Sequence, residues 1–82
     1  MKPIPDHWAP FLMKQPETGM GYFVATVTLK DGTSFKQVVI DSGFITVVRG
    51  FDFIPFDPRD ITDIQVTHDK WDWHLITHNR NA

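Results

Sequence analysis

Three glycine turns divide the middle of this chain into short runs of strand-forming residues. The turns are Asp31-Gly32, Ser42-Gly43 and Arg49-Gly50, and each glycine can take the left-handed backbone conformation that many tight turns need. The runs between them are too short for an average helix and are rich in β-branched and aromatic side chains. This spacing predicts consecutive antiparallel hairpins.

The composition indicates the same fold class. Val, Ile, Thr and the aromatic residues together number 33 of the 82 residues, whereas Ala and Leu contribute only three each. Nine of the ten acidic residues are Asp, which favours turns and caps, and only one is Glu, which favours helix interiors. Because there is no cysteine, apolar packing has to stabilise the fold without disulfides or a thiolate zinc site. We expect a single mainly β domain.

Alternating apolar and polar residues predict the individual strands. Residues 20–29 alternate with a period of two, which is typical of a half-buried strand. A bulged turn at Gly32 then places Val27 opposite Phe35 in the return strand. The same signals predict further strands at residues 33–40, 44–48, 51–54 and 62–67.

Residues 57–60 predict one helical turn before the last of these strands. Asp57 can cap free amides, Pro58 suits the first helical position, and Asp60 lies where a capping box places its acid. Four strands, a helical turn and a fifth strand form a layout that is similar to SH3-like and Sm-like small barrels. This resemblance concerns the layout alone, so it implies a small antiparallel meander or open barrel of about five strands and no particular function.

The two ends of the chain differ from the β core at residues 20–67. Residues 1–19 form a proline-rich cap, because four prolines there exclude a central strand. Within the cap, residues 6–14 predict a short helical turn that covers one end of the sheet. Residues 68–82 form a tail rich in aromatic and histidine side chains, in which 69–78 fit either a sixth strand, which we favour, or a helix.

The charge and hydropathy of the chain exclude several partners. The formal net charge is −2 and the pI is near 6.0, so there is no general attraction to nucleic acid or to an anionic membrane. No stretch approaches the roughly 18 apolar residues of a membrane span, and the start lacks the apolar run of a signal peptide, so we expect a cytoplasmic protein. Residues 41–82 carry seven Asp against four basic residues, which suits a basic partner.

Nucleic-acid binding by a small barrel is one alternative function. Exposed aromatic rings can stack on bases, and the basic track that phosphates require would have to come from Lys14, Lys30, Lys36 and Arg49. The intervening turns carry acids whose carboxylates would repel phosphates, namely Asp31, Asp41 and Asp52. We therefore rank nucleic acid below a protein as the partner.

A metal site in the tail is a second alternative. Five potential ligands lie within eleven residues: His68, Asp69, Asp72, His74 and His78. Imidazole and carboxylate groups bind zinc, nickel or iron, and a helix would align His74 with His78. The spacing completes no known metal motif, so we expect no cofactor and keep this group, centred on His68, Asp72, His74 and His78, as a hypothesis.

A non-catalytic protein-interaction module is the function that the sequence favours. Ser34 and Ser42 lack a nucleophile-elbow context and there is no glycine-rich phosphate loop, so we expect no enzyme activity. Exposed strand edges and amphipathic aromatic rings are typical of protein contacts. The expected partner is another protein or a second copy of this chain, and the expected contact residues are Trp8, Tyr22, Trp71 and Trp73.

Overall fold

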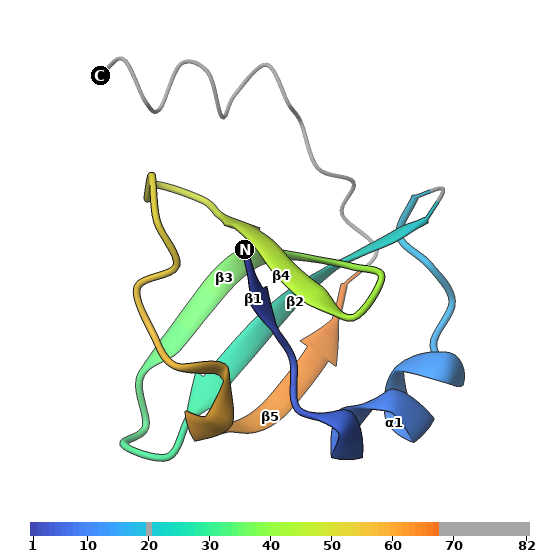
Figure 1. Cartoon of the computed structure of the whole chain (residues 1–82), viewed down its shortest axis with the longest axis horizontal. Helices are drawn as coiled ribbons and strands as arrows, with labels where there is room; N and C mark the ends of the chain where they lie inside the picture. The colour runs from blue at the N-terminus through green and yellow to red at the C-terminus, as the bar shows by residue number, and fades with distance from the viewer. Residues whose placement is uncertain (20, 68–82) are drawn as a thin grey trace.

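The computed structural model describes residues 1–19 and 21–67, which form an antiparallel sheet of five strands in the order β1-β4-β3-β2-β5 (Figure 1). The strands are β1 (Lys2–Pro3), β2 (Tyr22–Leu29), β3 (Ser34–Asp41), β4 (Phe44–Val48) and β5 (Ile61–Val66). The sheet curls into a half-barrel whose edges are β1 and β5. The prediction of a mainly β fold with about five strands is confirmed.

Two short helical segments between β1 and β2 pack against the inner side of this sheet (Figure 1). They are the 3-10 helix η1 (Asp6–Trp8) and the helix α1 (Ala9–Met13). A proline in the first turn of α1 costs no hydrogen bond, because the first amides of a helix have no partner within it. Leu12 is buried, and Trp8 and Phe11 pack against the same core, so the predicted helical turn at 6–14 is confirmed.

The hairpin of β2 and β3 has the predicted register. Val27 lies opposite Phe35, and the Leu29 N–H donates a hydrogen bond to the Thr33 carbonyl, with 2.8 Å between N and O. Gly32 has a φ of 90°, the left-handed conformation that the bulged turn requires. The alternation of residues and a single glycine were therefore enough to predict this pairing.

The turn between β3 and β4 contains a strained serine. Asp41 pairs with Phe44, and the two residues between them, Ser42 and Gly43, have φ values of 54° and 82°. Two positive φ values are typical of a type I′ turn, for which Asn followed by Gly is the preferred sequence. Ser42 therefore occupies a position that suits asparagine better.

We expect Ser42→Asn to stabilise the protein. Asparagine tolerates the left-handed conformation at lower cost, so the free energy of unfolding should rise by about 0.5 kcal/mol and the melting temperature by about 2–4 °C. Thermal unfolding followed by circular dichroism measures the shift. Ser42→Val is the opposing control, because a β-branched side chain resists positive φ and should lower the melting temperature. Equal melting temperatures for the two variants would contradict this interpretation of the turn.

The strand predicted at residues 51–54 is wrong. The Phe51 N–H donates to the Val48 carbonyl at 3.1 Å and forms an isolated bridge, but no strand follows it. β1 lies along the same outer edge of β4, but it pairs only with the first two residues of that strand, with Lys2 opposite Ile45 and Pro3 opposite Phe44. The sequence gives no signal for β1, because this strand has only two residues and one of them is Pro3. Proline is tolerated there because β1 is an edge strand.

Buried side chains gather on both faces of the sheet. The main core lies between the half-barrel and the N-terminal helices, and its buried members are Ile4, Leu12, Ala25, Val27, Leu29, Val38, Ile40, Ile45, Val48, Phe56, Ile61 and Ile64. A smaller cluster on the opposite face consists of Val24 and Val39, with Tyr22 and Val47 packed against it. Since successive residues of a strand point to opposite faces, β2 and β3 are apolar on both sides at their centres.

A threonine side chain takes the place of one ladder bond between β2 and the residue that follows β5. The Thr67 N–H donates to the Val24 carbonyl at 2.8 Å. The return bond is replaced by the Thr18 hydroxyl, which accepts from the Val24 N–H and donates to the Thr67 carbonyl, both at 2.9 Å. Thr18 thereby ties the end of the N-terminal segment to two strands of the sheet.

The helical turn predicted at 57–60 is present as η2 (Pro58–Asp60). The Arg59 N–H donates to Asp57 Oδ1 at 2.9 Å, and an Nη of its guanidinium donates to Asp57 Oδ2 at 2.7 Å. Asp57 is thus the predicted cap. Asp60 does not complete a capping box, because its carboxylate pairs with Lys30 Nζ at 3.2 Å.

This cap predicts a loss of stability in acid. The hydrogen bonds from the Arg59 side chain, followed by the one from its backbone, lower the pKa of Asp57 from 3.8 to about 2. A lowered pKa means that the stabilising contribution of the carboxylate is complete above about pH 4 and is lost as the pH falls towards 2. Asp57→Asn keeps an acceptor for the cap but removes the charge. We expect the melting temperature of this variant to fall less than that of the wild type between pH 4 and pH 2. An equal fall in both proteins would contradict the role of the Asp57 carboxylate in the acid-dependent loss of stability.

Candidate docking groove

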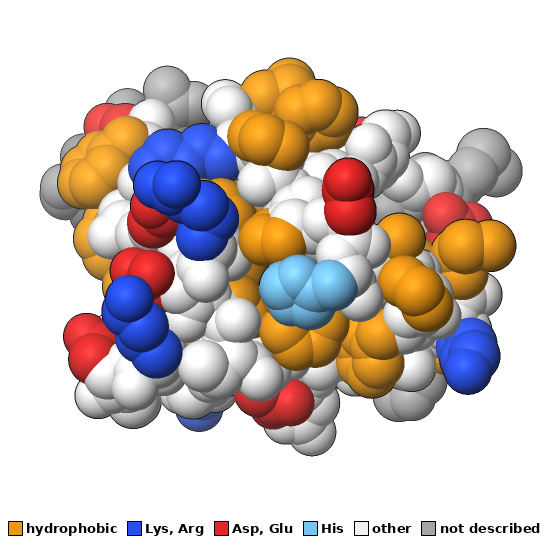
Figure 2. All heavy atoms as spheres, turned by 60° about the horizontal axis from the view of Figure 1, so that its bottom comes forward, with side chains coloured by type: hydrophobic (Ala, Val, Ile, Leu, Met, Phe, Trp, Pro, Cys, Tyr) orange, Lys and Arg blue, Asp and Glu red, His pale blue; other side chains and the backbone are white. Residues whose placement is uncertain are grey.

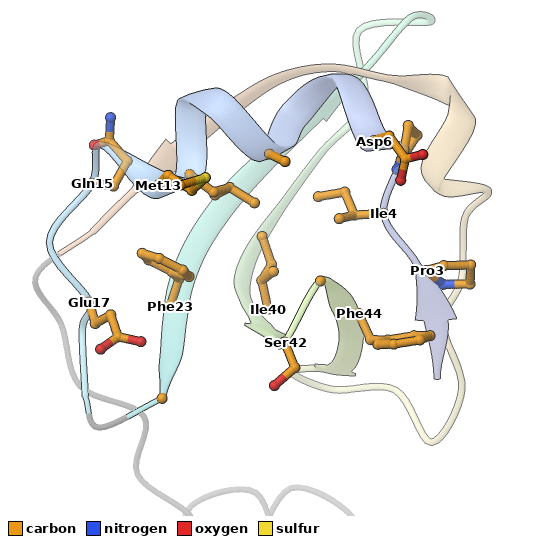
Figure 3. A pocket seen from close by; sticks show the side chains of 15 residues that line it. Pro3, Ile4, Asp6, Met13, Gln15, Glu17, Phe23, Ile40, Ser42 and Phe44 are labelled. Carbon is orange, nitrogen blue, oxygen red and sulfur yellow. The ribbon is translucent and has the colours of Figure 1, made fainter.

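A groove of about 820 Å³ lies between the N-terminal segment and the adjoining ends of β2, β3 and β4 (Figure 3). Most of the side chains that line it are apolar, among them Ile4, Leu12, Met13, Phe23, Ile40 and Phe44. Phe23 and Ile40 enter it from the sheet, and Ile4 enters it from the N-terminal segment (Figure 3). We call this cavity the docking groove.

The lining of the docking groove combines buried and exposed apolar side chains. Ile4 and Ile40 belong to the main core and are 8% and 1% exposed. Phe44 and Met13 are 38% and 85% exposed, although both are large and apolar. An apolar base with exposed apolar side chains around it leaves hydrophobic surface that a ligand can cover.

Backbone geometry fixes one wall of the docking groove. The Ile4 N–H donates to the Gly43 carbonyl at 2.9 Å, which holds the N-terminal segment beside the turn between β3 and β4. Pro3 and Pro5 flank this bond, and neither has an N–H to donate to a further strand. Pro5 is extended, with φ −56° and ψ 143°, and it directs the chain into η1.

The charged side chains that line the docking groove are both acidic. Asp6 and Glu17 lie on opposite sides of it in the view of Figure 3. Within residues 1–19 and 21–67, neither carboxylate forms an ion pair or a side-chain hydrogen bond. The ammonium group of Lys2 is occupied elsewhere, because it donates to the Phe56 carbonyl at 3.1 Å. The charge that the lining itself presents to a ligand is therefore negative.

The two predicted contact residues within the described part of the chain lie on opposite faces of the sheet. Trp8 packs against the main core, with its ring centroid 5.9 Å from that of Phe11. Its Nε1 atom is buried and has no acceptor among the described residues. Tyr22 packs on the smaller cluster, and its ring lies so close to Gly19 that a side chain there would displace it. Neither residue lines the docking groove.

The face formed by η1 and α1 is largely apolar. Figure 2 shows hydrophobic side chains gathered around His7, whose ring centroid lies 5.2 Å from that of Trp8. Most of the Lys and Arg side chains in this view lie towards its left, together with several acidic side chains. The N-terminal segment therefore presents apolar side chains to the core and also to the surface next to the docking groove.

Two exposed rings that are not among the predicted contact residues lie after the turn at Gly50. Phe53 is 66% exposed and stacks edge-on against Phe51, with ring centroids 5.7 Å apart. Phe51 contacts Phe35 in the same manner at 5.9 Å. The sequence Phe-Asp-Phe after Gly50 could have indicated these exposed rings, but the same alternation also predicts a short strand.

The metal ligands, the remaining contact residues and the sixth strand or helix at 69–78 were all predicted for a segment that lies outside the described residues. Trp71, Trp73 and the group His68, Asp69, Asp72, His74 and His78 lie outside the described residues. In residues 1–19 and 21–67, no three His, Asp or Glu side chains come together as a metal site would require. Of the basic residues considered for a nucleic-acid track, Lys30 is paired with Asp60.

Comparisons with known proteins give no further guide to the function. In the described part of the chain, no helix has the length and apolar character needed to cross a bilayer. No protein-family model, curated protein or solved structure matches this chain.

Proposed function

We propose that this chain is a non-catalytic protein-interaction module that binds an apolar segment of another protein in the docking groove. The observation that carries the proposal is the mainly apolar lining, which includes the exposed Phe44 and Met13 as well as the buried Ile40. Removing each large side chain from water gains about 1.5–3 kcal/mol when burial is complete. Two partly exposed side chains therefore offer a useful share of the free energy of binding.

The shape and chemistry of the docking groove suit a polypeptide segment better than a small molecule. Its volume of about 820 Å³ lies near the upper end of the range for ligand sites. A small-molecule site usually has several polar groups that converge on the ligand, whereas the polar side chains here, such as Ser42 and Glu17, lie around the apolar lining (Figure 3). A peptide can place successive apolar side chains along such a surface.

The layout of the strands supports the same proposal by analogy. Small SH3-like barrels bind short peptides on grooves beside their sheets, and we propose a comparable use of this half-barrel. We keep the cytoplasm as the proposed location. The module would need no cofactor.

Selection from a random peptide library on the intact chain tests the proposal. We expect selected peptides to shift the amide signals of groove residues in NMR spectra and to lose at least tenfold in affinity for Phe44→Ser. Phe53→Ser is the matched control, because Phe53 is more exposed and lies outside the groove. Affinity that depends on Phe53 and is unchanged by Phe44→Ser would refute the proposed site.

A further inference from the structure

We infer that the docking groove selects a basic segment of a partner protein, with Lys or Arg side chains on both sides of its apolar residues. This inference rests on the proposed function and adds the charge of the ligand to it. It starts from the two charged residues that line the groove, Asp6 and Glu17, which lie on opposite sides of the apolar lining (Figure 3).

Both carboxylates are available to a ligand. Asp6 and Glu17 are exposed, and neither pairs with a cation of the described chain. The ammonium group of Lys2 is hydrogen-bonded to the Phe56 carbonyl instead. A bound segment that carries two cations would therefore gain two ion pairs without first breaking internal ones.

The N-terminal wall of the groove offers few free backbone N–H groups, so a ligand has to be recognised mainly by side chains. A peptide that adds a strand to a sheet needs backbone N–H groups on the exposed edge. Along the N-terminal wall, Pro3 and Pro5 have no N–H, and the N–H of Ile4 is already bonded to Gly43. Specificity then has to come from apolar contacts and from charge, which are the two features that the groove offers.

The same charges disfavour an anionic membrane as the occupant. Anionic lipid headgroups attract clusters of Lys and Arg, and they would be repelled by Asp6 and Glu17. The carboxylate of Asp41, which accepts a hydrogen bond from the Ser42 hydroxyl beside the groove, adds to this repulsion. A positively charged polypeptide is the partner whose charge complements the groove.

The test compares a selected peptide with a version in which Gln replaces each Lys and Arg. We expect the neutral version to bind about 2- to 30-fold more weakly at low salt, since two exposed ion pairs, each of which is weak, are lost together. The double variant Asp6→Asn with Glu17→Gln should cause the same loss for the basic peptide and no further loss for the neutral one. In 1 M salt both differences should disappear. Asp63→Asn, an exposed acid on β5 away from the groove, is the control and should change nothing.

The outcomes separate this inference from the function on which it rests. If peptides bind in a manner that depends on Phe44 but the two neutralised acids have no effect, the basic ligand is refuted and the groove stands. If no selected peptide depends on Phe44, the proposed function itself fails. If sedimentation shows a dimer of the intact chain that Phe44→Ser dissociates, the occupant is a second copy, and the inference of a separate basic partner is overturned.

Discussion

Ile45→Ala is expected to lower the free energy of unfolding by about 2–5 kcal/mol, because it leaves a cavity in a core that cannot fully collapse around it. Ile45 is fully buried at the centre of the main core, opposite Ile40 of β3. A domain of 82 residues has about 4–12 kcal/mol of stability in total. The variant should therefore lose a large share of this stability.

Urea unfolding followed by tryptophan fluorescence measures this loss. Ile45→Val removes one methyl group from the same site and should cost only about 0.5–1.5 kcal/mol, so the two variants together calibrate the packing. A cost for Ile45→Ala below about 1 kcal/mol would contradict the packing described here, since it would mean that the site collapses freely or is open to water.

Thr18→Val should lower the free energy of unfolding by about 1–3 kcal/mol, although valine has nearly the same shape as threonine. The variant removes the hydroxyl that accepts from the Val24 N–H and donates to the Thr67 carbonyl. Val24 is fully buried, so water cannot easily replace the lost partner, and an unsatisfied buried amide costs about that much.

Thr18→Ser is the matched control because serine keeps the hydroxyl. We expect it to retain most of the stability of the wild type and the slow hydrogen exchange of the Val24 amide, which should become fast in Thr18→Val. If Thr18→Val leaves both the stability and the slow exchange of the Val24 amide unchanged, the inserted hydroxyl does not stabilise the sheet. Because Thr18 follows Glu17 directly, the valine variant should also loosen one side of the docking groove.

Local signals in the sequence were sufficient for those parts of the fold that local interactions determine. The hairpin through Gly32, the capped turn at Asp57 and the N-terminal helical turn each depend on residues within about ten positions of one another. Periodicity, turn chemistry and capping act over that range. The predicted strands at 33–40, 44–48 and 62–67 agree with β3, β4 and β5 to within one residue at each end.

Pairings between distant residues could not be predicted in this way. The bond between Ile4 and Gly43 and the pairing of Lys2 with Ile45 join segments about forty residues apart, and no periodic pattern marks them. These contacts form one wall of the docking groove. The groove therefore depends on the same distant contacts, and for this reason Phe44 and Met13 were absent from the predicted site.

The two edges of the half-barrel limit how far the sheet can grow. One edge is the two-residue strand β1, which contains Pro3, and the other is β5, whose exposed side chains include the charged Asp63. A proline interrupts the backbone donors that an incoming chain would need, and a carboxylate in the middle of a strand opposes stacking of identical copies. The protein should accordingly resist edge-to-edge aggregation at high concentration near neutral pH, despite its high content of β-strand and of apolar side chains.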